Sequence, residues 1–177
     1  MIALKITNVK RAMNLLLNQN ETAFDAFLVS SVRIVTNVSV TIDGHLQKEF
    51  YTSEELEEMQ REAENEGRVF STEMVRYARI RQKCFDLIKG SKTPLAFVIT
   101  FYLAGENVER FLSGIDTTLT LQDVAGLSLN LKYENDELIA TCATSLRTFT
   151  ADRSVERAWD SMVKKFFDRQ EIAYEEL

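Results

Sequence analysis

The chain has little of what usually marks a specialised site or an irregular fold. Its 177 residues include one Pro, one His, one Trp, two Cys and six Gly. With so few prolines and glycines, long irregular loops are not expected. No apolar run approaches the roughly 20 residues that a helix needs to cross a bilayer, so no membrane association is predicted. The start, MIALKITNVKR, has no apolar stretch behind a positive charge, which excludes a recognisable signal peptide and favours a cytoplasmic location.

The scarcity of sulfur and imidazole also limits metal and cofactor chemistry. Cys84 and Cys142 lie far apart without CxxC spacing, so we expect two reduced, buried thiols. Together with His45 they are too few for the usual nitrogen and sulfur zinc site. The chain contains no glycine-rich phosphate loop and no dinucleotide fingerprint, and we predict no cofactor and no metal.

What the chain does have is apolar residues and charge in the proportions of a folded domain. An apolar fraction of 45% and eleven Phe favour a globular protein over a disordered one. A net charge of −6 supplies no overall attraction to nucleic acid or to an anionic membrane, although a local basic surface remains compatible with it.

A short self-similarity organises the chain into two halves. Asn8-Val9-Lys10-Arg11 recurs as Asn107-Val108-Glu109-Arg110, each at the start of a helical pattern after an apolar strand. We predict two βαβββ halves, 1–51 and 94–151, in one compact domain of residues 1–177. In the first half the predicted elements are a strand at 2–6, a helix from Asn8, alternating strands over 27–42, a hairpin turn at Asp43-Gly44 and a strand at 46–51. In the second half they are a strand at 95–103, a helix ending near Gly114, a strand at 126–133, a turn at Asn135-Asp136 and strands at 138–143 and 146–150.

The remaining residues read as helical additions to these halves. Thr52 with Glu55 forms a capping box at the start of a Glu-rich helix. A second helix is predicted from Ser71 to Gly90, which makes 52–93 an inserted helical pair. Residues 152–177 are expected to form a C-terminal helix, whose last residues, 171–177, either pack against the fold or fray. The predicted fold class is therefore α+β, with duplicated halves, an inserted helical pair and a C-terminal helix.

One basic cluster is the candidate contact site. Arg76, Arg79 and Lys83 project together if the second inserted helix forms, because their spacing is three and four residues. Such a face suits phosphate groups or an acidic partner. Salt bridges to the preceding Glu-rich helix, or plain solvation, compete with this interpretation.

Other chemically suggestive residues have simpler explanations. His45 lies next to the predicted Asp43-Gly44 turn, where a solvent-exposed tip is poorly suited to acid-base catalysis. The Glu residues between 54 and 66 are distributed around a helix surface, whereas hard-cation sites converge carboxylates from a shaped loop. No catalytic set of residues is recognised.

Two resemblances can be named on particular stretches. MIALKITNVKRAMN, CFDLIKGSKTPLAF, LIATCATSLRTFT and AWDSMVKKFF resemble a family of uncharacterised proteins from Firmicutes, catalogued as a domain of unknown function. The doubled βαβββ order is similar to that of DNA sliding-clamp domains. The stretch from Val124-Ala125-Gly126-Leu127 to Glu137-Leu138-Ile139-Ala140-Thr141 resembles a clamp half. That second resemblance implies a clamp-like scaffold.

Two functional hypotheses follow. The first is a non-enzymatic cytosolic interaction or scaffold protein that binds another protein or itself, with nucleic acid as a further partner class. The alternative is an enzyme or small-ligand-binding protein with a pocket between the halves. Its candidate polar residues are Tyr102, Asn130, Thr144 and Arg147.

Overall fold

The chain folds around one antiparallel sheet. The computed structural model describes residues 1–67, 69–71 and 73–177. Within these residues, eight strands pair in the order β3-β2-β5-β6-β7-β1-β8, with β4 joined to β2 outside this path. The strands are β1 (Ala3–Ile6), β2 (Leu28–Val35), β3 (Ser39–Asp43), β4 (Val75–Arg76), β5 (Ala96–Tyr102), β6 (Val124–Glu134), β7 (Glu137–Leu146) and β8 (Tyr174–Glu176).

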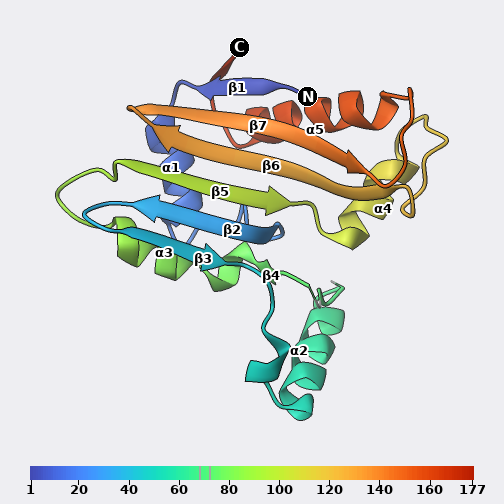
Figure 1. Cartoon of the computed structure of the whole chain (residues 1–177), viewed down its shortest axis with the longest axis horizontal. Coiled ribbons are helices and arrows are strands. Elements are labelled where there is room, and N and C mark those ends of the chain that lie inside the picture. The colour runs from blue at the N-terminus through green and yellow to red at the C-terminus, as the bar shows by residue number, and fades with distance from the viewer. Residues whose placement is uncertain (68, 72) are drawn as a thin grey trace.

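The helices cover one side of this sheet. Figure 1 shows α1, α3 and α5 behind the strands, α4 beside the ends of β5 and β6, and α2 away from the rest of the molecule. The α-helices are α1 (Val9–Leu17), α2 (Ser53–Asn65), α3 (Arg81–Ile88), α4 (Gly105–Ser113) and α5 (Ser154–Arg169), and the short 3₁₀ helices are η1 (Lys48–Phe50) and η2 (Tyr77–Arg79). The predicted α+β class is confirmed.

The hydrophobic core lies between the sheet and this helix layer. In β5, Phe97, Ile99 and Phe101 are buried, whereas the residues between them are half-buried. This alternation is expected when one side of a strand packs on a core and the other side faces solvent. Trp159 of α5 is completely buried, and its indole N–H donates to the carbonyl oxygen of Ser128 at 3.0 Å.

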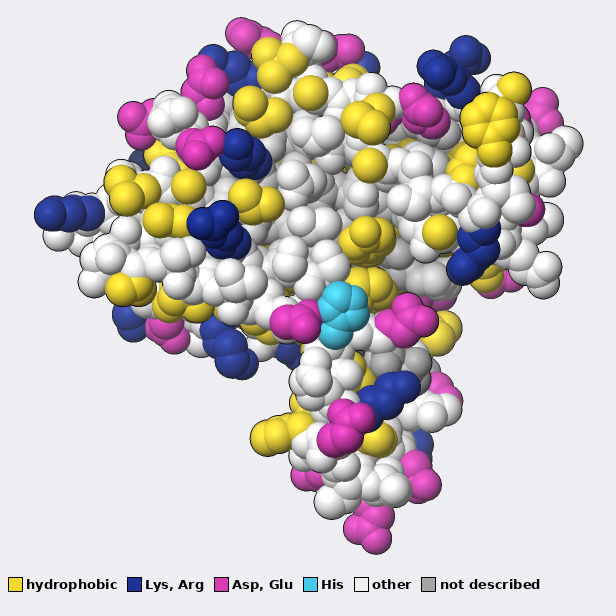
Figure 2. Space-filling model, viewed as in Figure 1, with side chains coloured by type: hydrophobic (Ala, Val, Ile, Leu, Met, Phe, Trp, Pro, Cys, Tyr) yellow, Lys and Arg dark blue, Asp and Glu magenta, His cyan; other side chains and the backbone are white. Residues whose placement is uncertain are grey.

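The opposite side of the sheet is open and largely polar. Ser31, Thr100, Asn130 and Thr141 are aligned across four neighbouring strands. The Thr100 hydroxyl donates to the Asn130 side-chain oxygen at 3.0 Å. Figure 2 shows this side, where hydrophobic side chains form small separate patches.

Several local predictions are confirmed. The capping box at Thr52 and Glu55 opens α2. Asn135 and Asp136, with φ of 53° and 63°, form the turn between β6 and β7. In each case a few adjacent residues specify the backbone without help from distant ones.

The predicted hairpin at Asp43-Gly44 and the strand at 46–51 are wrong. The chain continues past β3, where the Gly44 N–H donates to Ser30 and its carbonyl accepts from Val75, both at 2.9 Å. A Cβ atom on Gly44 would lie 1.9 Å from the Val29 carbonyl oxygen. The glycine is therefore required for a close backbone approach rather than for a turn, and residues 48–50 form η1.

The predicted α-helix from Ser71 to Gly90 is also wrong for the described residues before Arg81; residue 72 lies outside the described residues. The Ser71 hydroxyl accepts from the Met74 N–H at 3.2 Å, but the chain then pairs as β4 with β2. The N–H of Tyr77 donates to the Phe27 carbonyl at 3.0 Å, and α3 begins only at Arg81. Sheet pairing thus takes the backbone groups that a helix would have used.

The two halves share an element order but not a pairing pattern. The predicted strands 138–143 and 146–150 are replaced by one strand, β7, which ends at Leu146. Each half therefore supplies strand, helix, strand, strand. The hairpin pairs β2·β3 and β6·β7 correspond, but β5 pairs with β6 whereas β1 pairs with β7 and β8. Duplication and the clamp-like architecture stay predictions.

The C-terminal residues extend the sheet. The predicted C-terminal helix, α5, ends at Arg169, and β8 then pairs with β1. Ile172 between them is 2% exposed. The last segment is therefore packed into the fold instead of continuing the helix over 152–177.

Candidate functional site

The segment 46–74 is called the arm here, and its described residues project from the sheet and its helices (Figure 1). The arm contains η1 and α2 and is attached at its base by short backbone pairing. His45 and Met74 form an antiparallel bridge, and the Leu46 N–H donates to the Glu73 carbonyl at 2.9 Å. At the start of α2, the Thr52 hydroxyl accepts from the Glu55 N–H at 3.2 Å while the Glu55 carboxylate accepts from the Thr52 N–H at 2.7 Å.

The arm carries a charge equal to that of the whole chain. It contains nine Glu and three Lys or Arg, a net of −6, which leaves eighteen acidic and eighteen basic residues elsewhere. Acidic side chains gather on the projecting part of the molecule in Figure 2. The remainder of the protein is electrically balanced, so the molecule has one acidic end.

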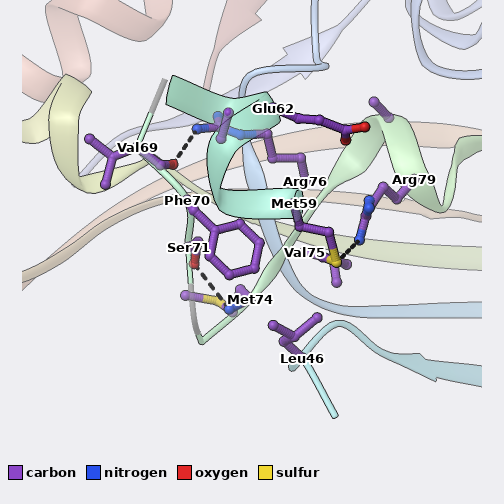
Figure 3. Close-up of a pocket in the computed structure, with 12 residues that line it drawn as sticks. Leu46, Met59, Glu62, Val69, Phe70, Ser71, Met74, Val75, Arg76 and Arg79 are labelled. Atoms are coloured by element: carbon purple, nitrogen blue, oxygen red, sulfur yellow. Dashed lines mark hydrogen bonds between the residues drawn. The ribbon is translucent and has the colours of Figure 1, made fainter. Parts of the chain in front are cut away.

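A pocket of about 180 Å³ lies between α2 and the base of the arm (Figure 3). Its lining is mainly apolar, with Met59 and Ala63 from α2 facing Phe70 and Met74 from the returning chain. Glu62 and Arg79 supply charged groups on different parts of the wall. No sequence pattern predicted this pocket, because α2 meets a returning segment that was expected to be helical from Ser71 and instead leads into β4.

Arg76 anchors the base of the arm to the sheet and to α4. Its guanidinium donates to the carbonyls of Ala26 at 2.8 Å and Val69 at 3.2 Å. It also forms an ion pair with Glu106 of α4, with 2.5 Å between Nη2 and Oε1. The two side chains are 11% and 16% exposed, so the guanidinium is engaged in holding the arm.

The predicted basic cluster is spread over three elements. Arg76 lies in β4, Arg79 in η2 and Lys83 in α3, so they do not share a face of one helix. The Arg79 guanidinium donates to the Met59 sulfur at 3.8 Å, and Lys83 is exposed. Arg79 and Lys83 are thus the members accessible to phosphate or an acidic partner, and that contact stays a prediction.

Exposed hydrophobic residues mark the arm as well. Phe50 in η1 is 81% exposed, and its ring meets the Tyr51 ring edge-on with 5.2 Å between centroids. Val69 is 60% exposed. The exposure of Phe50 could have been predicted from the sequence. Tyr51 and Leu56 have the spacing of a hydrophobic staple around the capping box, so Phe50 is not needed to pack against the helix.

The other candidate residues do not converge. His45 lies 2.6 Å from the carboxylate of Asp43, and both side chains are exposed. Hydrogen bonds from the backbone and ring of His45 lower the pKa of the Asp43 carboxyl. This exposed pair has no enclosure that would exclude water.

The polar residues proposed for a pocket between the halves lie on different sides of the sheet. The buried hydroxyl of Thr144 faces the helix layer beside Leu127, whereas Asn130 faces the open side beside Thr100. Tyr102 belongs to the open side as well, and Arg147 follows the end of β7. These four residues do not form one cavity.

The described residues contain neither a metal-ligating cluster nor a membrane-spanning helix. No group of three or more His, Cys, Asp or Glu among them is placed to hold a metal ion. In the same part of the chain, none of the helices combines the length and apolar character required to cross a membrane.

Comparison with known proteins identifies the family. The model of a family of unknown function, DUF5721, matches residues 14–175, and the chain belongs to this family. No curated protein and no solved structure matches the chain significantly.

Proposed function

We propose that this chain is a cytoplasmic, non-enzymatic adaptor that binds a partner protein through its arm. The observation that carries the proposal is the concentration of the molecule's net charge and of the highly exposed Phe50 on one projecting segment. Functional residues commonly lie on segments displayed by a rigid scaffold, and here the sheet with its helices is that scaffold.

The arm contributes little to the stability of the rest of the protein. Within the described part of the chain, none of its residues belongs to the main hydrophobic cluster, and Ala63 is the one buried residue of α2. An exposed aromatic ring beside a dense set of like charges gives the isolated molecule no packing benefit. Both features have a physical use when a partner covers the ring and balances the charge.

The arm's charge argues against two other kinds of partner, a second copy of the chain and nucleic acid. A second copy brings another acidic arm, which the first arm repels, or a remainder without net charge, which provides no overall attraction to the arm. Nucleic acid is repelled by the same charge. A different protein is therefore the partner class that the arm fits best.

Affinity capture with matched variants tests the proposal. Phe50→Asp removes the exposed ring of the arm, whereas Phe149→Asp makes the same change at a residue that is 101% exposed between β7 and α5, far from the arm. Tagged wild-type protein and both variants are incubated with lysate of the source organism, and bound proteins are quantified by mass spectrometry. A protein retained by wild type and Phe149→Asp but lost from Phe50→Asp is the expected result. Identical sets from all three proteins would contradict it.

Light scattering of the purified proteins examines the second copy directly. The proposal predicts that Phe50→Asp leaves the molar mass unchanged. A wild-type oligomer that dissociates in this variant would show that the arm binds another copy of the chain instead.

A further inference from the structure

We propose that the pocket between α2 and the base of the arm binds one bulky apolar side chain from a basic segment of the partner. This inference rests on the proposed function and specifies the chemistry of the partner. The pocket's size, its lining and the charges around it each contribute to the argument.

The volume suits a single side chain. The pocket has a volume of about 180 Å³ and is open to solvent on one side. Engineered apolar cavities of about 150 Å³ accommodate a benzene molecule, so this space admits one aromatic or large aliphatic group. Protein interfaces often derive most of their affinity from such an anchor inserted into a pocket.

The lining favours an apolar group of adaptable shape. Met59 from α2 and Met74 from the base of the arm lie on either side of the Phe70 ring (Figure 3). Thioether side chains are flexible and polarisable, which lets them adjust to different apolar groups. The Met59 sulfur accepts a hydrogen bond from the exposed Arg79 guanidinium.

The charge beside the pocket specifies what flanks the anchor. Glu62 of α2 lines the pocket, and Glu58, outside the lining, precedes it by one turn on the same face of the helix. Neither carboxylate forms an ion pair with any residue in the described ranges. Lys or Arg next to an inserted anchor would meet these carboxylates, and such complementarity gives specificity and faster association.

Arg79 is the cation that opposes this preference. Arg76 is neutralised by Glu106, but Arg79 lies on the pocket wall without a carboxylate partner among the described residues. If the partner's segment is basic, the two charge reversals should have opposite effects on its affinity. Glu62→Lys should weaken binding, and Arg79→Glu should strengthen it. An acidic segment predicts the reverse order.

The test uses a library of random peptides displayed on phage and selected on the immobilised full-length chain. Selected peptides are synthesised, and their affinities are measured by fluorescence anisotropy. We expect them to share an aromatic or large aliphatic residue flanked by Lys or Arg. Replacing that anchor by Ala should weaken binding about tenfold, which corresponds to the loss of a modest hot spot.

The variants then locate the site. Glu62→Lys should weaken binding about threefold to tenfold, as expected for a reversed charge at an interface, and Arg79→Glu should strengthen it. Glu57→Lys is the matched control, because it makes the same change on α2 at an exposed residue outside the pocket lining. Circular dichroism confirms that each variant is folded.

Three results would overturn the inference: acidic selected peptides, no selected peptides, or equal weakening by Glu57→Lys and Glu62→Lys. Any of them can occur while the Phe50-dependent capture of a partner persists, in which case the arm binds by another surface. The opposite combination is also distinguishable. If no protein is captured in a manner that depends on Phe50, but basic peptides bind the pocket, the adaptor proposal as stated is rejected and the pocket remains a site for basic peptides.

Discussion

The guanidinium of Arg76 and the carboxylate of Glu106 join the base of the arm to α4 across a largely buried contact of 2.5 Å. The same guanidinium donates to the Ala26 and Val69 carbonyls, so one side chain connects four segments of the chain. The arm is therefore held to its scaffold mainly by polar contacts at its base, whereas its outer surface stays free for binding.

Breaking this ion pair should destabilise the protein. Glu106→Gln leaves a buried guanidinium without its counter-charge, and we expect the free energy of unfolding to fall by about 2 kcal/mol. Urea unfolding followed by circular dichroism measures the change. Glu109→Gln, an exposed position on the same helix, should have little effect. Equal stability of the two variants would show that the pair does not hold the arm.

The close approach at Gly44 makes a sharper prediction. Gly44→Ala places a methyl group against the Val29 carbonyl, and we expect a loss of about 3 kcal/mol or more because backbone must move. Gly44→Asn should be at least as damaging, although Asn is accepted in many hairpin turns. Gly105→Ala is the control, since its Cβ meets nothing within 4 Å and alanine favours a helix. Tolerance of Gly44→Asn in thermal unfolding would restore the hairpin interpretation.

The two thiols should be unreactive while the protein is folded. Burial raises the pKa of Cys84 to about 11 and that of Cys142 to about 12. Since the thiolate is the reactive form, a disulfide reagent at mildly alkaline pH should label neither residue until denaturant is added. Rapid labelling of the native protein would contradict the buried positions of both residues.

The raised pKa values of the two thiols also determine how alkaline pH changes the stability of the fold. A thiol whose pKa is raised by folding binds its proton more tightly in the folded state than in the unfolded state. Its contribution is therefore intact below the ordinary value of 9.0 and is lost as the pH rises toward about 11. Burial also raises the pKa of Tyr77, which acts in the same direction. Denaturant titrations across this range should show falling stability, and a rise would contradict the assignment.

Local sequence signals predicted the elements that depend on neighbouring residues. The Thr52 capping box and the Asn135-Asp136 turn each specify their structure within one or two turns of chain. The helix predicted from Ser71 is wrong because the chain that follows Ser71 forms β4, which pairs with β2 more than forty residues earlier in the sequence. Nothing near Ser71 records that pairing.

Arg81 shows the same limit for single side chains. In the sequence it is one of several basic residues, yet it is 4% exposed. Its guanidinium lies 5.4 Å from the Tyr77 ring centroid and donates to the Glu21 carbonyl at 2.6 Å and to the Asp25 carboxylate. Burial here depends on the 19–27 segment folding over α3, which periodicity cannot predict. The pocket escaped prediction for a similar reason.

The most direct test of the arm as a binding element is site-specific photo-crosslinking in intact cells of the source organism. A photoreactive phenylalanine analogue is introduced at Phe50 or, as the matched control, at Phe149, and adducts are detected after irradiation. The account predicts a discrete adduct with another protein from position 50 and none from position 149. Adducts from position 149 alone, or the same adducts from both positions, would contradict the claim that the arm is the binding surface.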